Sequence, residues 1–216
     1  MFDTNRFVRN LERMYEGVWD NAVQSAKCKV QNDGSDINNL LHQAFAYQNA
    51  GKLAEAERIC QQILGHQPDQ PDALHLLGII AYGVGKHQQS LELIHKAIRI
   101  FPHNPTYYNN LGTIYKSLNR LDDAERAYRK AIEIKPDFSE PIYNLGNVLK
   151  AGHRMEEAFA CYHKAVQIKP DYADAYNNLG TGLKDMERLD EAIAYFGKLL
   201  KSSRILRKFI TIWAVH

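Results

Sequence analysis

The amino-acid sequence predicts an all-α protein, a solenoid of about five helix-turn-helix units that are each 34 residues long. Two observations support this fold class. Apolar residues follow the spacing of amphipathic helices, and residues of the same kind recur every 34 positions. Four series keep this step in phase, namely Gly78, Gly112, Gly146 and Gly180; Leu77, Leu111, Leu145 and Leu179; Pro68, Pro102, Pro136 and Pro170; and Ala56, Ser90, Ala124, Ala158 and Ala192.

The segment before the repeats, residues 1–27, has a pattern of its own. Phe7, Leu11 and Val18 fall on one face of a helix, so we expect an amphipathic N-terminal helix that caps the solenoid or binds a partner. Residues 28–36 are polar and contain a glycine, which is typical of a linker.

The repeat region spans residues 37–200. In its third unit, Tyr108, Leu111 and Tyr115 form the stripe of a first helix, and a second stripe follows a short turn. Pro136 ends the second helix, because proline lacks an N–H and clashes with the preceding turn. Neither helix alone can bury its stripe, so neighbouring units must stack. The expected units are 37–70, 71–104, 105–138, 139–172 and 173–200.

This 34-residue unit, with its Leu-Gly, Tyr, Ala, aromatic, Ala and Pro positions, resembles the tetratricopeptide repeat. The resemblance implies a right-handed superhelix whose first helices line the concave side. The first unit departs from the pattern, because Gln43 and Ala44 stand where later units have Leu and Gly. Terminal repeats are often atypical, since one side of them faces solvent.

Residues 201–216 break the repeat, and basic residues gather at this end: Lys198, Lys201, Arg204, Arg207 and Lys208. One interpretation is a basic amphipathic tail for a membrane surface or an acidic partner. The interpretation that we favour is a frameshift in the gene, because a one-base change of frame can read ALEIKPDFAEVYHNLGGA, which restores the repeat in phase. The chain is then a truncated piece of a longer array, and the nucleotide sequence tests this.

Composition excludes several classes of protein. Lys and Arg number 27 against 25 Asp and Glu, and this net charge of +2 is too even for an electrostatic binder of nucleic acid. Cys28, Cys60 and Cys161 form no closely spaced pair, so neither a disulfide framework nor a zinc site is predicted. No stretch approaches the roughly 18 apolar residues of a membrane span. We expect a cytoplasmic protein with no cofactor and no metal.

Catalysis has little support in the sequence. The nine histidines are scattered over different repeat positions, and no Gly-rich phosphate loop or Gly-x-Ser-x-Gly motif occurs. No strand-like stretches remain from which a catalytic α/β region would be built. The sequence therefore predicts that the chain is not an enzyme.

A row of asparagines on the first helices is the main candidate for binding. Asn110, Asn144 and Asn178 each precede a Leu-Gly pair. They are similar to asparagines that form a ladder in the O-GlcNAc transferase superhelix, and this resemblance implies that they grip the main chain of an extended peptide. A carboxamide suits this role because it both donates and accepts hydrogen bonds. The alternative is that they bond only to neighbouring repeats or to water.

Other polar residues surround this ladder at the same 34-residue step. We expect them to line the groove, with the lysines forming either a positive edge that favours acidic segments or a solvated row. They are Asn109, Tyr143 and Asn177; Thr113, Asn147 and Thr181; and Lys116, Lys150 and Lys184.

The predicted function is a non-catalytic interaction module that binds an extended polypeptide or a partner protein. A second hypothesis comes from Phe2-Asp3-Thr4, Leu11-Glu12, Tyr15 and Trp19, which look like the C-terminal end of O-GlcNAc-transferase-like glycosyltransferases. It makes the chain a substrate-recruiting arm or a fragment of such an enzyme. A third is self-association through an apolar face of the last unit that includes Phe196, Leu199 and Leu200.

Overall fold

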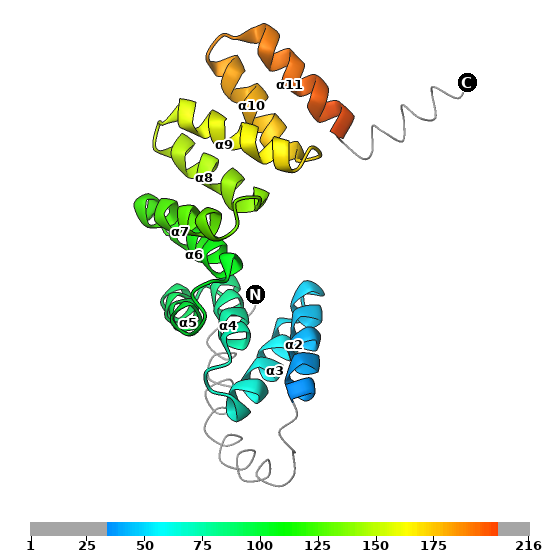
Figure 1. Cartoon of the computed structure of the whole chain (residues 1–216), viewed down its shortest axis with the longest axis vertical. Helices are drawn as coiled ribbons and strands as arrows, with labels where there is room; N and C mark the ends of the chain where they lie inside the picture. Colours follow the sequence, from blue (N-terminus) through cyan, green and yellow to red (C-terminus); the bar gives the residue numbers. More distant parts are fainter. Residues whose placement is uncertain (1–33, 203–216) are drawn as a thin grey trace, which may run out of the picture. The chain divides into compact units, whose positions relative to one another are not determined.

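The computed structural model describes residues 34–202, which form α-helices joined by short turns and contain no β-strand (Figure 1). First and second helices alternate. The first helices are α2 (Gly34–Asn49), α4 (Pro71–Gly83), α6 (Pro105–Ser117), α8 (Ser139–Ala151) and α10 (Ala173–Asp185). The second helices are α3 (Leu53–His66), α5 (His87–Ile100), α7 (Leu121–Ile134), α9 (Met155–Ile168) and α11 (Leu189–Ser202).

Several expectations fall outside the described residues. They are the amphipathic helix within residues 1–27, the likeness of residues 2–19 to a glycosyltransferase, and the basic tail from residue 203 onwards. The linker expected over 28–36 is described only from Gly34, where α2 begins. None of the described helices combines the length and the apolar character needed to cross a membrane.

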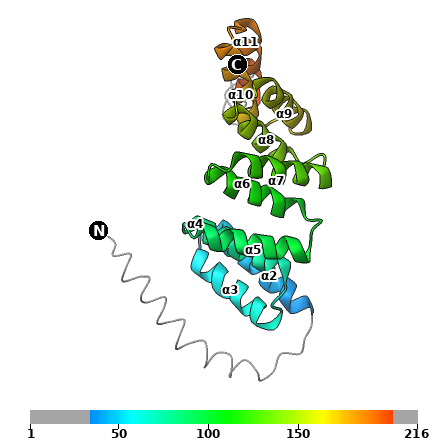
Figure 2. The same ribbon diagram turned by 90° about the vertical axis from the view of Figure 1, so that its left-hand side faces the viewer.

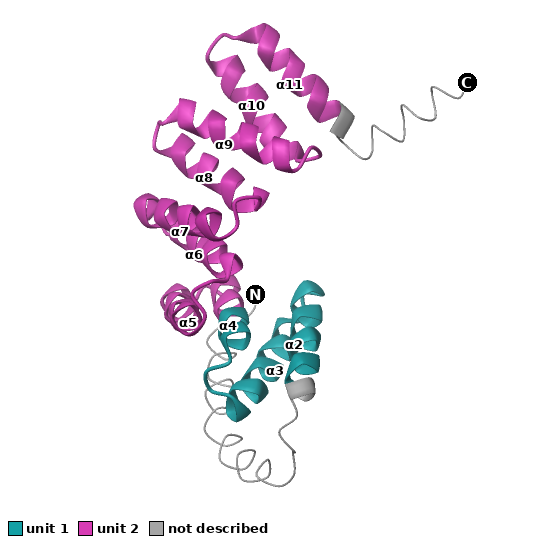
Figure 3. Cartoon of the chain, in the orientation of Figure 1, with its two compact units in different colours: residues 1–76 teal, residues 77–216 magenta. Residues whose placement is uncertain are grey.

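The chain divides into two compact units, residues 1–76 and 77–216 (Figure 3). In the first unit, α2 packs against α3 around Ala44, Ile59 and Ile63, which are buried. In the second unit, each first helix lies beside the second helix of its own repeat, as in α6 with α7 and α8 with α9 (Figures 1 and 2). The second helices α7 and α9 also pack against the next first helices, α8 and α10. The all-α helical repeat class predicted from the sequence is confirmed.

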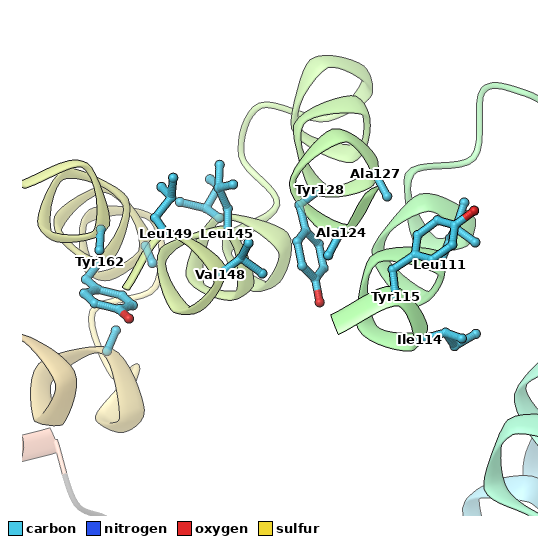
Figure 4. Packing of buried hydrophobic residues seen from close by; sticks show 14 of the residues in the cluster. Leu111, Ile114, Tyr115, Ala124, Ala127, Tyr128, Leu145, Val148, Leu149 and Tyr162 are labelled. Carbon is cyan, nitrogen blue, oxygen red and sulfur yellow. The ribbon is translucent and has the colours of Figure 1, made fainter. Parts of the chain in front are cut away.

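The recurring glycine of the first helix lies under a large side chain of the second helix. A Cβ added to Gly112, Gly146 or Gly180 would lie 2.6 Å from a ring carbon of the aromatic residue 16 positions later, and at Gly78 it would meet Ile94 at the same distance. Tyr128 and Tyr162 are fully buried by this contact, and Figure 4 shows their rings among other side chains of the cluster. The glycine series is therefore required by the close approach of the two helices of a repeat.

Every turn between a first and a second helix places one residue in the left-handed region. The next backbone N–H donates to a carbonyl five residues back, as from Arg120 to Tyr115 at 2.9 Å and from Arg154 to Leu149 at 2.9 Å. This pattern is a Schellman motif, which satisfies carbonyls at the end of a helix. The left-handed residues are Gly51 (φ 74°), Gly85 (φ 80°), Asn119 (φ 57°), His153 (φ 60°) and Glu187 (φ 60°), again 34 residues apart.

Gly146→Ala tests the glycine contact. The new methyl group would overlap the ring of Tyr162, which is 0% exposed and has no room to move away, so we expect a loss of about 1–3 kcal/mol in the free energy of unfolding. Urea denaturation followed by circular dichroism measures it. Gly197→Ala is the matched control, because that helical glycine has no atom within 4 Å of the added Cβ. The control should gain roughly 0.5–1 kcal/mol through helix propensity, and an equal gain at position 146 would contradict the contact.

Candidate functional site

The predicted ladder lies on three successive first helices of the second unit. Asn110 is on α6, Asn144 on α8 and Asn178 on α10, and all three side chains are half-buried. Each precedes the buried Leu-Gly pair of its helix, so the ladder residue lies at the edge of the buried face and borders the neighbouring repeat. Asn110 also has interaction partners within the chain.

Asn144 reaches back to the preceding repeat. Its Nδ2 donates to Oδ1 of Asn109 at 3.2 Å, and Nδ2 of Asn109 donates to Oε1 of Glu140 at 3.0 Å. Asn109 is only 2% exposed. The sequence predicted that Asn109 lines the groove. The structure instead buries Asn109 between α6 and α8, where it accepts the hydrogen bond from Asn144.

Asn178 makes the corresponding contacts one repeat later. Its Nδ2 donates to Oδ1 of Asn147 at 2.9 Å and to the hydroxyl of Tyr143 at 3.3 Å. Oδ1 of Asn147 also accepts a bond of 2.9 Å from the hydroxyl of Tyr162. Burial raises the pKa of Tyr162, so this hydroxyl stays protonated and donates at physiological pH. The side-chain amide of Asn147 on α8 therefore forms hydrogen bonds with both α9 and α10.

These bonds fix how the two carboxamides are turned. In Asn144 and Asn178 the nitrogen points to the preceding repeat and donates there. Within the described part of the chain, no donor reaches the Oδ1 atom of either residue. The orientation of each carboxamide is therefore fixed, and its oxygen is able to accept a further hydrogen bond.

The remaining predicted residues differ in exposure. Thr113 is half-buried and bonds to the backbone oxygen of Asn109 at 3.1 Å and to the hydroxyl of Tyr128 at 3.2 Å. Thr181 is half-buried, whereas Asn177 is exposed. Of the lysines predicted to form an edge, Lys116 and Lys184 are exposed and Lys150 is half-buried.

Tyr143, which the sequence predicted beside the ladder, belongs to a group of tyrosines whose other members, Tyr162 and Tyr172, were missed by the sequence analysis. The ring of Tyr143 lies 4.8 Å from that of Tyr172 and 5.8 Å from that of Tyr162, measured between centroids. Nζ of Lys169 lies 4.9 Å from the centroid of Tyr172. A signal was present, because Lys-Pro-Asp followed by an aromatic residue occurs at 135–138 and again at 169–172. The tyrosines give the polar row an aromatic border.

Together these features define a helical repeat protein whose first helices carry a row of oriented carboxamides. Tetratricopeptide repeat models match residues 39–69, 69–137 and 139–205. The chain belongs to the tetratricopeptide repeat family, as its 34-residue pattern predicted.

Solved structures with the same fold are similar to this chain at low sequence identity. MamA is 24% identical, with a TM-score of 0.67 over 76% of this chain and 96% of its own. PilF of Pseudomonas aeruginosa is 18% identical, with a TM-score of 0.75 over 79% of each chain. YrrB, described as a TPR protein with an unusual peptide-binding site, is 18% identical, with a TM-score of 0.60 over 80% of this chain and 90% of its own. No curated protein matches the chain.

Asn147→Ala tests the hydrogen bonds that join the repeats. The change leaves the buried hydroxyl of Tyr162 and an N–H of Asn178 without an acceptor, and an unpaired buried polar group costs about 1–3 kcal/mol. We expect a loss of that size in urea denaturation. Thr181→Ala is the matched control, because Thr181 has the same repeat position but no side-chain hydrogen bond within the described residues. Equal losses in both variants would show that the bonds of Asn147 contribute nothing.

His75 makes stability depend on pH. It occupies the repeat position of Asn109 and is 4% exposed, and burial lowers its pKa from 6.5 to about 4, against an opposing effect of Asp72. The unfolded chain therefore takes up a proton more readily, so stability is full above pH 6.5 and falls by about 3 kcal/mol between pH 6.5 and 4. Urea denaturation across this range measures the fall. We expect His75→Asn to reduce it, while His42→Asn, at an exposed position, leaves it unchanged.

Proposed function

We propose that α6, α8 and α10 bind an extended polypeptide, without catalysis, through the carboxamides of Asn110, Asn144 and Asn178, the last two with their Oδ1 atoms as acceptors. The observation that carries this proposal is the orientation of the carboxamides of Asn144 and Asn178. Their nitrogens are held by the preceding repeat, and their oxygens receive no donor from the described residues. A peptide main chain offers N–H groups at regular intervals, which matches a row of acceptors in successive repeats.

Fixed acceptors favour binding for two physical reasons. The side chains of Asn144 and Asn178 already lose rotamer freedom in the free protein, so less entropy is lost when the peptide binds. A main-chain N–H is also present in every residue except proline, so this contact selects an extended chain and not a particular sequence. We infer that proline at a ladder-facing position of the peptide is disfavoured.

Selectivity in this proposal comes from the residues around the ladder. The exposed amines of Lys116 and Lys184, with Lys150 between them along the chain, favour segments that carry Asp or Glu. The half-buried rings of Tyr143 and Tyr172 offer apolar surface beside Asn178. Peptide binding described for YrrB supports the use of this fold for peptides, although the likeness at 18% identity concerns the fold alone.

The two other hypotheses concern different parts of the chain. A substrate-recruiting role beside an O-GlcNAc-transferase-like enzyme rests on residues 2–19, which the structure does not describe, and it stays a prediction. Self-association through the last repeat rests on Phe196, Leu199 and Leu200 of α11, of which only Leu200 is exposed, because Phe196 and Leu199 are half-buried. The orientation of the ladder favours the peptide-binding proposal.

Backbone methylation of a bound peptide tests the proposal. A 12-residue acidic peptide that binds the full chain, chosen from a peptide array, is remade with one N-methyl group at each position in turn. We expect methylation at the ladder-facing positions to weaken binding about fivefold to tenfold each, because a hydrogen bond of roughly 1 kcal/mol is lost. Isothermal titration calorimetry measures the affinities.

Variants of the chain complete this experiment. Asn144→Ala should weaken binding of the unmethylated peptide by a similar factor. It should also abolish the effect of N-methylation at the one peptide position that faces Asn144. Asn39→Ala, at an exposed asparagine of α2, is the control and should change neither quantity. The proposal is wrong if affinity is insensitive to methylation at every position, or if Asn144→Ala leaves the methylation pattern intact.

A further inference from the structure

The first helix α4 lacks the polar row that the later first helices carry. Leu76 stands at the ladder position of α4 and is only 1% exposed. Ile79 stands at the position of Thr113, and Tyr82 stands at the position of Lys116. The positions that line the proposed groove therefore change from aliphatic and aromatic residues on α4 to mainly polar residues from α6 onwards.

Ile79 and Tyr82 belong to the same compact unit as the ladder. The contacts around Gly78 hold this end of α4 on α5. A Cβ added to Gly78 would lie 2.6 Å from the side chain of Ile94, and the hydroxyl of Ser90 donates to the backbone oxygen of Gly78 at 2.7 Å. This end of α4 is therefore packed on its second helix as the first helices of the ladder are.

The side chains of Ile79 and Tyr82 are half-buried, so each packs partly against the core and keeps part of its surface in contact with solvent. The ring of Tyr82 lies 5.6 Å from that of His87, measured between centroids. Burial raises the pKa of Tyr128 to about 12, and the phenol of Tyr82 adds to this rise. The hydroxyl of Tyr128 in turn lies 3.2 Å from Oγ1 of Thr113. Tyr82 is therefore on the side of α4 that faces the third repeat.

The repeat step places Ile79 beside the first residue of the ladder. In α8 the equivalent residue is Asn147, whose Oδ1 accepts a bond of 2.9 Å from Asn178 of the next first helix. For Ile79 the ladder residue of the next first helix is Asn110. Ile79 offers apolar surface at the place where Asn147 offers an acceptor, so a bound chain gains free energy there by removing this surface from water.

We propose that Ile79 and Tyr82 form an apolar subsite, called here the anchor subsite, for one large apolar side chain of the bound peptide. This inference rests on the peptide-binding proposal, and it narrows the ligand to an extended acidic segment that has Leu, Ile, Met or Phe at one end. A ladder that contacts only the main chain lets a peptide shift along it, because every residue except proline offers the same N–H. An apolar side chain held at α4 fixes the register and decides which end of the segment lies there. The acidic residues then lie over α6, α8 and α10, where Lys116, Lys150 and Lys184 favour them.

Two pairs of peptides test the anchor subsite. The acidic peptide of the methylation experiment is remade with Leu or with Ser as its first residue, and in the second pair with Leu or with Ser as its last residue. In one of the two pairs we expect the Leu peptide to bind about fivefold to tenfold more tightly than the Ser peptide, because partial burial of a leucine side chain removes apolar surface from water. Isothermal titration calorimetry with the full chain measures the four affinities.

Changes in the chain locate this preference to α4. The double variant Ile79→Thr with Tyr82→Gln should bring the Leu and Ser peptides of that pair within about twofold of each other, because it removes the apolar surface without adding a charge. Binding of the Ser peptide should stay unchanged, which shows that the ladder is intact. Ile79→Thr alone should lower the preference at least about twofold, and it decides the question if the double variant no longer binds the Ser peptide. Ile100→Thr is the matched control, because Ile100 is a 39% exposed residue of the second helix α5, and it should keep the preference.

The results separate failure of the anchor subsite from failure of the ladder. The anchor subsite is overturned if neither pair shows a preference for Leu, if the preference persists in the variants of Ile79, or if Ile100→Thr removes it equally. Failure of the peptide-binding proposal has a different signature. Asn144→Ala then binds every peptide as tightly as the unchanged chain does, and the anchor subsite is overturned with it.

Discussion

The contact between a glycine of the first helix and a large side chain of the second helix is the constraint on which each repeat after the first depends. Gly112, Gly146 and Gly180 let an aromatic ring of the second helix lie directly on the helical backbone, and the rings over Gly112 and Gly146 are fully buried. A ring in this position fills the space between the two helices and sets their separation. Because the contact recurs every 34 residues, successive repeats of the second unit have the same internal geometry.

The candidate site follows from this regularity. When the helix pairs stack with one geometry, a side chain at a given repeat position meets the same position of the preceding repeat each time. Asn144 meets Asn109, and Asn178 meets Tyr143 and Asn147. The partners differ but the direction of donation is the same, so the nitrogens of Asn144 and Asn178 both point to the preceding repeat. The row of acceptors is thus a product of stacking as much as of the asparagines themselves.

Much of this arrangement was predictable from the sequence, because the 34-residue series and the helical stripes are properties of residue spacing. Spacing does not reveal which of two adjacent asparagines is buried, since Asn109 and Asn110 differ by only 100° around the helix axis. The burial of Asn109 depends on Glu140, which comes from the next repeat. Likewise, the contact of Phe159 with Gly182 joins two repeats, and Gly182 belongs to no series in the sequence. Contacts within a repeat could be read from periodicity, whereas contacts between repeats required the three-dimensional stacking.

The residue in the left-handed region of each turn has a consequence for the local stability of the repeats in the second unit. Gly85 adopts this conformation at little cost, whereas a residue with a side chain pays about 1 kcal/mol or more, and His153 and Glu187 are of this second kind. In a stacked array, each repeat contributes its own free energy and that of its interfaces. The turns at His153 and Glu187 therefore make the fourth and fifth repeats easier to unfold locally than the same repeats with glycine at these turns. The ladder residues Asn144 and Asn178 belong to these two repeats and share this lower local stability.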